Sequence, residues 1–595
     1  MNDFEALYSK PLPSQRSGSF YNSFPYPTKI SPEAIAVYIA CATKPGDTVM
    51  DTFAGSGSTG IAALLCEHPT SRMKKIADEL NVQPVWGSRN AVLYEIGTYA
   101  AFAIKTITSR LSSQEFTIAA EDFLRKAQEL DGEMYKAVDP DGNDGVIRYV
   151  IWSEVLLCPR CGQEISYFDH GTTRNPVSFK REMECPSCGN LFPVGKTTFA
   201  TEWYYDRLLG KRISRKKRVP AWIYGTSNDH NWDRKATEAD ALLVSDIENN
   251  FDTDDSPKPI NWGELHRTGY HYGITHLHHF YTARNYAVMS SLWKLAETYP
   301  EKISSALKLL LLSYNASHST LMTRVVAKKN AKDFILTSAQ SGVLYISRLP
   351  VEKNILLGLR RKAKSFSETY ALLQNCQGHI ELHNSSSLDV QESANSIDYV
   401  FTDPPFGDYI PYAEVNQINE LWLGSVTNRQ DEVIISPSQG KDVFTYRELL
   451  VQVFTQIARV LKPSGYASVV FHSAKAKVWE AFGEAIDEAG LRVVLSNILD
   501  KKQASFKQVV SPGAVQGDPL FLLQPSASPH DSSLISDKEI LRSLMLTHVG
   551  DEGFNKRKLF SIYVNCCLEW GIEIKMDAPQ VYDFYDTYNN ENNNE

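Results

Sequence analysis

The chain has 595 residues, of which 43% are hydrophobic and 22% are charged, and its formal net charge is -9. This length is too great for one hydrophobic core, so about two to four domains are expected. The net charge excludes a uniformly basic binder of polyanions, so any contact with nucleic acid must be local. No apolar run is long enough to span a membrane, and no secretory signal opens the chain. Nine cysteines in such a chain indicate a reducing compartment, and we expect a cytoplasmic protein.

The N-terminal region is predicted to alternate helices with short buried strands. Its expected elements are a helix over 31–41, a strand over 48–52 and a helix over 60–66. A Gly-rich turn joins the last two, and Gly55 and Gly57 in this turn allow a tight bend and close approach to a ligand. Together with Gly60 they match the GxGxxG spacing of dinucleotide-binding loops, which is a weak signal by itself.

The next predicted strand covers 91–94 and ends at Glu95. A carboxylate in that position can bind the hydroxyls of a ribose, and the alternative is a surface carboxylate that ends a strand. Glu95 comes about twice as late in the chain as the dinucleotide pattern expects. We therefore interpret residues 66–89 as an insertion in the crossover connection.

Four cysteines form two CxxC knuckles, Cys158 with Cys161 and Cys185 with Cys188, and a glycine follows each knuckle. Two thiolate pairs at this spacing suit a tetrahedral zinc ion, although the gap between them is slightly long. Four thiolates leave no open position for a substrate, so we expect a structural zinc ribbon. The alternative is a pair of redox or unliganded thiols. A zinc-dependent deaminase is not expected, because no His-x-Glu element precedes either knuckle.

A basic segment flanked by aromatic residues follows the cysteines. Lysine and arginine beside aromatic rings suit contact with nucleic acid, and the alternative is a solvated charged loop. The residues expected to contact nucleic acid are Lys211, Arg212, Arg215, Lys216, Lys217 and Arg218. A second basic run at 360–364 is interpreted as ordinary surface.

The rest of the inserted region is expected to contain a long helical stretch. Residues 237–255 are acidic and weakly periodic, so we expect an exposed loop or partial disorder there. A histidine cluster at 276–279 has mixed spacing and no nearby carboxylate in the sequence. A polar lead-in to a helix is therefore favoured over a metal site. Helices are expected over 285–296 and 303–314.

The α/β pattern resumes after residue 379. The expected elements are strands over 380–384, 397–402, 467–472 and 491–496, and helices over 446–461 and 478–489. The second strand leads into Asp403-Pro404-Pro405-Phe406, where each proline fixes its own φ and restricts the residue before it. Such a turn can hold the Asp403 carboxylate and backbone carbonyls to accept hydrogen bonds from an exocyclic amine, with Phe406 as a stacking surface. By itself the motif could be only a rigid turn that ends a strand.

These blocks together resemble the amino-methyltransferases that transfer a methyl group from S-adenosyl-L-methionine to nucleic-acid bases. The matching segments are 24–32, 51–60, Glu95, 403–406 and 459–466. The resemblance implies a catalytic turn formed by Asp403, Pro404, Pro405 and Phe406. It implies cofactor binding by Thr28, Lys29, Asp51, Phe53, Ala54, Gly55, Gly57 and Glu95. Among these enzymes the chain is most similar to the bacterial adenine-specific DNA methyltransferases that carry an internal zinc ribbon.

The fold implied by this resemblance is α/β, with a Rossmann-like, doubly wound methyltransferase sheet split by a large insertion. The expected parts are the cofactor half of the methyltransferase domain (1–140), a zinc ribbon (145–200), an inserted helical and target-recognition region (201–375), the catalytic half (376–525), and a small C-terminal helical appendage (526–595) whose tail from residue 588 is disordered.

The activity implied is methylation of the N6 amine of adenine in a base flipped out of double-stranded DNA. Adenine is favoured over the N4 amine of cytosine because the turn begins with Asp, and the further alternative is an RNA base amine. The intact Asp403, Gly55 and Gly57 argue against a non-catalytic subunit. Tyr409 and Tyr412 are candidates for the wall of the base pocket, or for simple packing. A restriction-modification or phage-defence context with partner proteins, and no membrane, is expected.

Overall fold

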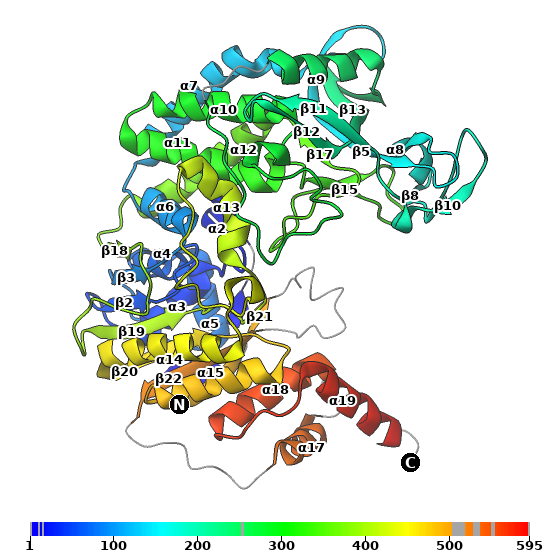
Figure 1. The fold of residues 1–595 in the computed structure, drawn as a ribbon. Helices are drawn as coiled ribbons and strands as arrows, with labels where there is room; N and C mark the ends of the chain where they lie inside the picture. The colour runs from blue at the N-terminus through cyan, green and yellow to red at the C-terminus, as the bar shows by residue number, and fades with distance from the viewer. Residues whose placement is uncertain are drawn as a thin grey trace.

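The computed structural model describes residues 3–9, 12–14, 17–250, 255–501, 518–526, 536–548 and 554–592. Within these ranges the chain forms a central eight-stranded sheet, an inserted region of helices and a second sheet, and a C-terminal group of helices (Figure 1). No helix in these ranges has the length and apolar character that crossing a membrane requires.

The central sheet has the strand order β1-β21-β22-β20-β19-β2-β3-β18. These strands are β1 (Leu12–Ser14), β2 (Thr48–Asp51), β3 (Asn90–Tyr94), β18 (Ile380–His383), β19 (Ile397–Thr402), β20 (Leu461–Val470), β21 (Leu491–Lys501) and β22 (Asp518–Pro525). All neighbours are parallel except β22, which runs antiparallel to β20 and β21. The predicted α/β class is confirmed in a mixed sheet, and β22 is a strand that the sequence did not predict.

The order of the strands creates a reversal in the middle of the sheet. The chain steps outward from β2 to β3 and β18, then returns to the other side of β2 through β19 and β20. The carboxyl ends of β2 and β19 therefore lie side by side, with Val49 opposite Tyr399 and Met50 opposite Val400. Open α/β sheets bind their ligands outside the carboxyl ends of the strands at such a reversal.

Helices cover both faces of the central sheet. Val49 belongs to the hydrophobic core on the face of α3 (Pro32–Ala42), α4 (Ser58–Leu65) and α5 (Ser71–Leu80). Met50, the next residue, belongs to the core on the face of α14 (Val443–Val460) and α15 (Ala476–Glu488). Successive strand residues point to opposite faces, so each strand contributes to both cores. On the second face α17 (Asp537–His548), α18 (Lys556–Glu569) and α19 (Ala578–Asn592) complete the layer.

The part of the chain between β3 and β18, called the inserted region from here on, joins a helical layer to a second sheet. Its helices include α6 (Thr98–Ile107), α7 (Ser113–Asp131), α10 (Ala283–Glu297), α11 (Glu301–Tyr314) and α12 (Ile355–Leu373). The sheet has the order β14-β13-β5-β17, formed by β5 (Asp144–Leu157), β13 (Arg218–Ser227), β14 (His230–Lys235) and β17 (Val351–Lys353), and β4 (Lys136–Val138) and β6 (Glu164–Ser166) also pair with β5. The predicted helices over 285–296 and 303–314 are confirmed, and the long strands β5 and β13 are elements that the sequence analysis did not predict.

Two further expectations need correction. Residues 238–250 form the helix α9 (Glu238–Asn250) rather than a loop, and Asp240 near its start is paired with Arg234. None of the residues of α9 is buried, which explains the weak periodicity of its sequence. The helix α19 continues through Asn592, so the expected disordered tail is wrong for residues 588–592. Residues 251–254 and 593–595 lie outside the described ranges.

Shorter elements complete the description. They are α1 (Asp3–Ser9), α2 (Ser19–Ser23), η1 (Gly132–Tyr135), α8 (Tyr167–Gly171), β7 (Thr172–Arg174), β8 (Val177–Phe179), β9 (Glu182–Glu184), β10 (Leu191–Pro193), η2 (Val194–Lys196), β11 (Thr201–Asp206), β12 (Lys211–Lys216), η3 (Leu277–Phe280), η4 (Asn315–Ser319), β15 (Arg324–Val326), β16 (Ile335–Thr337), α13 (Tyr412–Leu423) and η5 (Pro437–Gln439). Of these, β11 and β12 pair as an antiparallel hairpin.

Candidate functional site

A pocket opens where the carboxyl ends of β2 and β19 meet. Its volume is ≈ 990 Å³ including the open mouth. Its walls come from segments that are far apart in the sequence: residues 26–30, 51–56, 94–97, 385–387, Asp403, Pro405, 412–413 and 431–433. The segments that the sequence analysis assigned to a cofactor and to a catalytic turn therefore face one space.

The Gly-rich turn at the floor of this pocket depends on its glycines. Gly55 and Gly57 have φ values of 51° and 80°, in the left-handed region that disfavours side chains. A Cβ on Gly57 would lie 2.8 Å from Cγ1 of Ile104, and one on Gly55 would lie 3.1 Å from Cε1 of Tyr26. The backbone of the turn is thus packed closely between α6 and the segment that contains Tyr26.

Asp51 at the end of β2 ties the Gly-rich turn to β19. Its Oδ1 accepts hydrogen bonds from the backbone N–H of Phe53 (3.0 Å) and the hydroxyl of Thr402 (2.7 Å), and its Oδ2 accepts one from Thr59 (2.7 Å). Burial raises the pKa of Asp51 to about 6, and these hydrogen bonds oppose that shift. Asp51 was expected to bind the cofactor, and the structure shows its two oxygens already engaged by the protein.

Glu95 follows β3 and reaches back to the glycine turn. Its two carboxylate oxygens accept the backbone N–H groups of Gly55 and Gly97, each at 2.6 Å. Burial raises the pKa of Glu95 to about 8, the charges of Asp51 and Glu420 add to the rise, and the two N–H groups oppose it. Because each carboxylate oxygen has two acceptor sites, Glu95 can still accept hydrogen bonds from a ligand.

Two tyrosines form one wall of the pocket. The rings of Tyr26 and Tyr412 stack with centroids 6.0 Å apart, and the Tyr412 and Thr28 hydroxyls are 2.8 Å apart. Thr28 has φ of 58°, an uncommon value for a residue with a β-branched side chain. Tyr412 was a candidate for the pocket wall, whereas Tyr26 was missed although it lies in the segment 24–32 that carries the resemblance.

Lys29 does not point its ammonium at the glycine turn. Its Nζ donates to the backbone carbonyls of Phe20 (2.7 Å) and Phe24 (3.3 Å) and lies 3.8 Å from the centroid of each of these rings. The Lys29 ammonium is thus engaged by the protein, although the residue lines the pocket, and its predicted role in holding the cofactor stays a prediction.

The Asp403 turn after β19 is fixed by hydrogen bonds from neighbouring elements. The carbonyl of Pro405 accepts from the Tyr446 hydroxyl (2.6 Å) and from the N–H of Gly407 (3.1 Å), whose φ is 65°. Asp403 lines the pocket, and its charge adds to the effect of burial in raising the pKa of Tyr412 above the usual range. Pro404 is buried behind the turn.

Phe406 is packed into the core, contrary to the expectation of an open stacking surface. Only 6% of its surface is exposed, and its ring contacts Phe471 and His472 at centroid distances of 5.5 and 5.9 Å. Tyr409 is half-buried on the same turn, and the centroid of its ring lies 6.0 Å from that of His472. His472, which follows β20 at the same edge of the sheet, was included in the predicted strand over 467–472 but was not singled out as a site residue.

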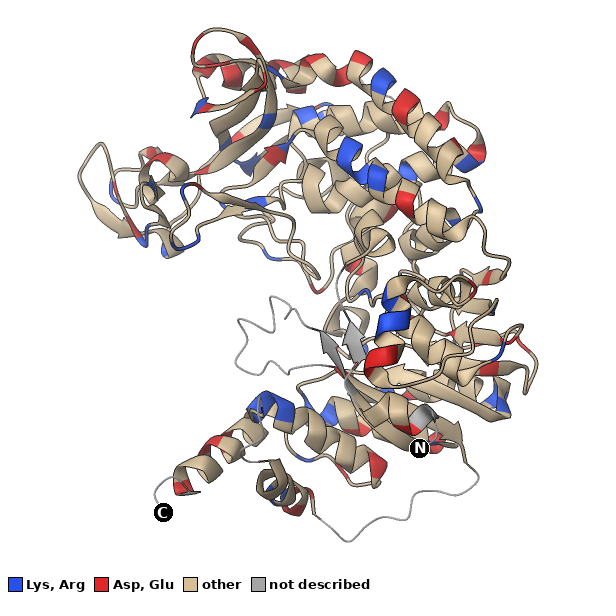
Figure 2. Ribbon diagram, turned by 180° about the vertical axis from the view of Figure 1, so that it is seen from behind, with Lys and Arg blue, Asp and Glu red and all other residues tan. Residues whose placement is uncertain are grey.

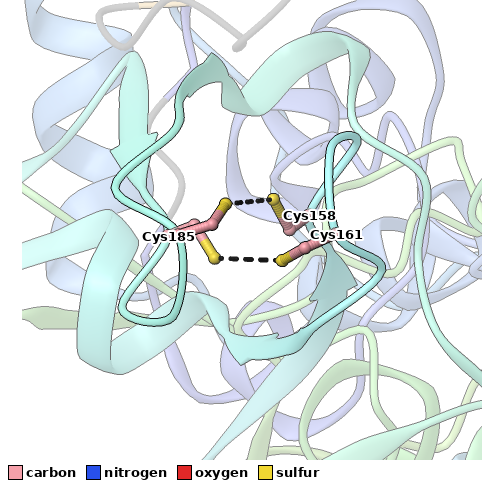
Figure 3. A group of neighbouring side chains, drawn as sticks. Cys158, Cys161 and Cys185 are labelled. Atoms are coloured by element: carbon pink, nitrogen blue, oxygen red, sulfur yellow. Dashed lines mark hydrogen bonds between the residues drawn. The ribbon is translucent and has the colours of Figure 1, made fainter.

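The four knuckle cysteines come together beyond the end of β5 (Figure 3). The Sγ atoms of Cys158 and Cys188 are 3.8 Å apart, and those of Cys161 and Cys185 are 3.6 Å apart. All four sulfurs lie within 4.8 Å of one another. In each knuckle the glycine N–H, from Gly162 or Gly189, donates to the carbonyl of the first cysteine. The cluster has the donors for a metal ion.

The basic segment is mostly occupied by internal ion pairs, which corrects the expectation for four of its six residues. Buried Lys216 and Arg218 share Glu154, with Lys216 Nζ at 2.7 Å and Arg218 Nη2 at 3.5 Å from its Oε1. Arg215 pairs with Glu202 and Glu248, and Lys217 pairs with Glu164. Lys211 and Arg212 remain exposed. Figure 2 shows basic and acidic residues mixed over both halves of the molecule.

The histidine cluster has a carboxylate partner that the sequence did not reveal. Nε2 of His278 and Nε2 of His279 lie 2.9 and 2.8 Å from Oδ2 of Asp206, which stands on β11. Nδ1 of His279 accepts the backbone N–H groups of Thr275 and His276. A neutral His279 must then carry its proton on Nε2 and donate it to Asp206, so that nitrogen has no lone pair for a metal. Asp206, His278 and His279 lie close enough together to be metal donors, but this hydrogen bond favours the predicted polar lead-in to a helix, which stays a prediction.

Comparison with known proteins bears on a part of the chain. Residues 4–70, which contain the segment 24–32 and the glycine turn, match the model of a family described as DNA methylase. Among solved structures that match is a crystal structure of the antibiotic-resistance methyltransferase Kmr, at 13% identity and a TM-score of 0.15, covering 27% of this chain and 66% of that chain. A likeness at this TM-score carries no argument about function. No curated protein matches the chain.

Proposed function

We propose that the protein is an S-adenosyl-L-methionine-dependent DNA methyltransferase that modifies the N6 amine of adenine. The observation that carries the proposal is the meeting of the Asp403 turn and the Gly55 turn in one pocket at the reversal point of the sheet. The similarity of residues 4–70 to a DNA methylase supports it. The resemblance further implies a cytoplasmic restriction-modification or phage-defence setting with partner proteins.

The residues on the β2 side fit a nucleoside cofactor. Glu95 would accept the ribose hydroxyls, and the closely packed backbone over Phe53, Ala54 and Gly55 would lie against the ligand. Tyr26 and Thr28 would close the pocket from the side. When bound, the cofactor supplies a methyl group on a positively charged sulfur. Asp51 would act indirectly, because its hydrogen bonds hold the turn against β19.

The residues on the β19 side fit a planar amine. The Asp403 carboxylate and the Pro404 carbonyl would each accept a hydrogen bond from the NH2 group and so orient its nitrogen. The turn that holds them is rigid, and catalysis is mainly correct positioning. An amine inside a duplex cannot reach this pocket, so the base must flip out. Tyr409 is better placed than buried Phe406 to stack on it.

The four cysteines are proposed to bind a structural zinc ion. A tetrahedral ion about 2.3 Å from each sulfur requires sulfur–sulfur separations of about 3.8 Å. The observed separations of 3.8 and 3.6 Å are close to this value. Four thiolates complete the coordination, so the ion would stabilise the ribbon and take no part in methyl transfer.

The test of the proposed function is the transfer of tritiated methyl from S-adenosyl-L-methionine to unmethylated bacterial DNA and to total RNA. Product nucleosides are then separated and identified. Label on N6 of adenine in DNA is the expected result. Label on N4 of cytosine would keep a DNA methyltransferase but change the base, label in RNA would change the substrate class, and label in neither would refute the proposal.

A further inference from the structure

A second, larger cleft adjoins the cofactor pocket. Its volume is ≈ 1670 Å³ including its open mouth, and it shares Tyr26, Pro27, Lys29 and Asn416 with the first pocket. The other walls come from the inserted region, through the π-helical turn η4, the loop 338–344 and the helix α12. The cleft therefore lies between the element that carries Thr28 and the helices that the insertion adds.

Cations line this cleft and carboxylates do not. The basic side chains on its walls are Lys29, His318, Lys353, Arg361 and Lys362. None of its lining residues is Asp or Glu. Across the described part of the chain, no ion pair involves Lys29, Lys353, Arg361 or Lys362. In a chain with a net charge of -9, so many cations without counter-charges are unusual.

The cations repel one another across the cleft. Burial and the charge of Lys362 lower the pKa of Lys29. Burial lowers the pKa of Lys362 to about 8, and burial with the charge of Arg361 lowers that of Lys353 to about 8. Lys353 and Lys362 therefore remain mostly charged at pH 7, and keeping these charges together lowers the stability of the fold. Groups perturbed in this way gather at functional sites.

The fold assembles this cluster from four distant segments. The π-helical turn η4 carries His318, whose Nδ1 lies 3.5 Å from Nζ of Lys353 at the end of β17. Nζ of Lys362 on α12 donates to the carbonyl of Asn22, 340 residues away (2.7 Å). A lysine ammonium has three N–H groups, so this bond positions Lys362 and leaves donors for a ligand. A π-helical turn is rare and is frequent at functional sites.

We propose that this cleft holds the phosphate backbone of the DNA next to the flipped base. The inference rests on the proposed function. Its position supports it, because Gly342 in the cleft wall packs against Ile410 in the segment after the catalytic turn, and Thr28 beside Lys29 contacts Tyr412. Its chemistry supports it as well, because Lys, Arg, Ser, Gln and Asn side chains supply most contacts to DNA phosphates. The serine, asparagine and glutamine side chains of the wall are those of Asn22, Ser317, Ser338, Gln340, Ser341, Ser365, Asn416 and Asn419.

The helix α12 offers a matched pair of variants for the test. Arg361→Gln with Lys362→Gln removes two charges inside the cleft. Arg360→Gln with Lys364→Gln removes the same number of charges from residues of the same helix that, like Arg361, are exposed, but that do not line the cleft. Binding of a short fluorescent DNA duplex of mixed sequence is measured by anisotropy over a series of salt concentrations. Non-specific affinity is set by phosphate contacts, so the target site need not be known.

For the cleft variant we expect affinity to fall about tenfold or more and the salt slope to fall in magnitude by about 2, as for two lost phosphate contacts. The control variant should keep the wild-type slope. Binding of S-adenosyl-L-homocysteine, measured by calorimetry, should stay unchanged in both, which shows that the fold is intact. Equal slopes in both variants would overturn the inference.

The wild-type protein separates the failure of this inference from the failure of the proposed function. If the wild type binds and methylates DNA while the cleft variant keeps its salt slope, only the cleft assignment is wrong. If the wild type methylates no DNA, the proposed function itself fails. If RNA of the same sequence binds more tightly and accepts the methyl group, the cleft serves RNA, and the assignment to DNA is overturned.

Discussion

The edge of the central sheet and the inserted region bring their functional residues together in different ways. At the sheet edge, Gly55, Glu95 and Asp403 each follow the carboxyl end of a strand, and the pairing of β19, β2 and β3 alone makes them neighbours. In the inserted region, the density of basic residues along the sequence does not predict where positive charge is left unpaired. Lys216 and Arg218, in the densest basic run, are neutralised by Glu154.

The sparser basic run on α12 is not neutralised in this way. Its Arg361 and Lys362 line the same cleft as Lys29 and Lys353, and no carboxylate lies on the cleft wall. The role of a charge is thus decided by what compensates it in space, and the density of charge along the chain is a poor guide. In a parallel sheet, the residues that follow each strand lie at the same edge, so their proximity can be predicted from the order of the strands. No such rule applies to an insertion of irregular topology.

Loss of the knuckle cysteines should give the largest effect and should separate the two regions. We expect Cys158→Ser to lose the bound zinc, because structural zinc binds with an apparent free energy on the order of 10 kcal/mol. The inserted region should then become sensitive to proteolysis, while the affinity for S-adenosyl-L-homocysteine at the sheet edge should change little. Elemental analysis and limited proteolysis measure these results. Cys41→Ser, outside the cluster, should keep the metal, and a wild-type protein purified without zinc would contradict the assignment.

Asp403→Ala tests whether the Asp403 turn acts on the target amine while Glu95 and the glycine turn bind the cofactor. We expect methyl transfer to fall by about 10³-fold or more, because the substitution removes an acceptor that orients the amine. Affinity for S-adenosyl-L-homocysteine should stay within about threefold, since Glu95 and the glycine turn are untouched. Asp408→Ala removes an exposed carboxylate five residues along that pairs with Lys475, and it should retain activity. Transfer at the wild-type rate in Asp403→Ala would show that the turn is only structural.

Glu154→Gln tests whether the basic segment is structural. Glu154 is 1% exposed, and its loss would leave Lys216 and Arg218 buried without compensation. Removing one partner of a buried ion pair costs about 3–5 kcal/mol, so we expect a clear drop in the thermal midpoint. The matched change Glu164→Gln, which removes the partner of half-exposed Lys217, should cost less than about 1 kcal/mol. If Glu154→Gln instead kept its stability, the segment would be free to contact phosphates as first expected.

The same contrast explains how far the sequence could predict the molecule. The strand over 397–402 was predicted because its short apolar run leads directly into the Asp403 turn, and the helix over 285–296 was predicted from a local pattern. The strand β22 was missed because a short apolar run is ambiguous without its antiparallel partners. The hairpin β11–β12 was missed because alternating charged and aromatic residues resemble a basic loop.

At the site, the predicted residues were those fixed by position in a motif at a strand end. The missed ones are defined by distant contacts. Asp206 is hydrogen-bonded to His278, 72 residues away in the sequence, and Lys362 donates to the carbonyl of Asn22, 340 residues away. No local pattern records such pairings, so the sequence could show the chemistry of each side chain but not its partner. For this reason the run at 360–364 was interpreted as surface.

The smallest predicted effect is a pH dependence of cofactor affinity that arises at Glu95. Its pKa is raised to about 8, so the carboxyl group is largely protonated at pH 7, and ribose hydroxyls that donate hydrogen bonds favour the ionised form. Binding must then release a proton below pH 8, and affinity should fall about fivefold between pH 8 and pH 7. Asp51, with a pKa of about 6, should add to the fall only at lower pH. Calorimetry with S-adenosyl-L-homocysteine in buffers of different ionisation enthalpy measures both affinity and proton release. Glu95→Gln should bind more weakly and lose the dependence above pH 7, and an unchanged pH profile in that variant would place the ribose contact elsewhere.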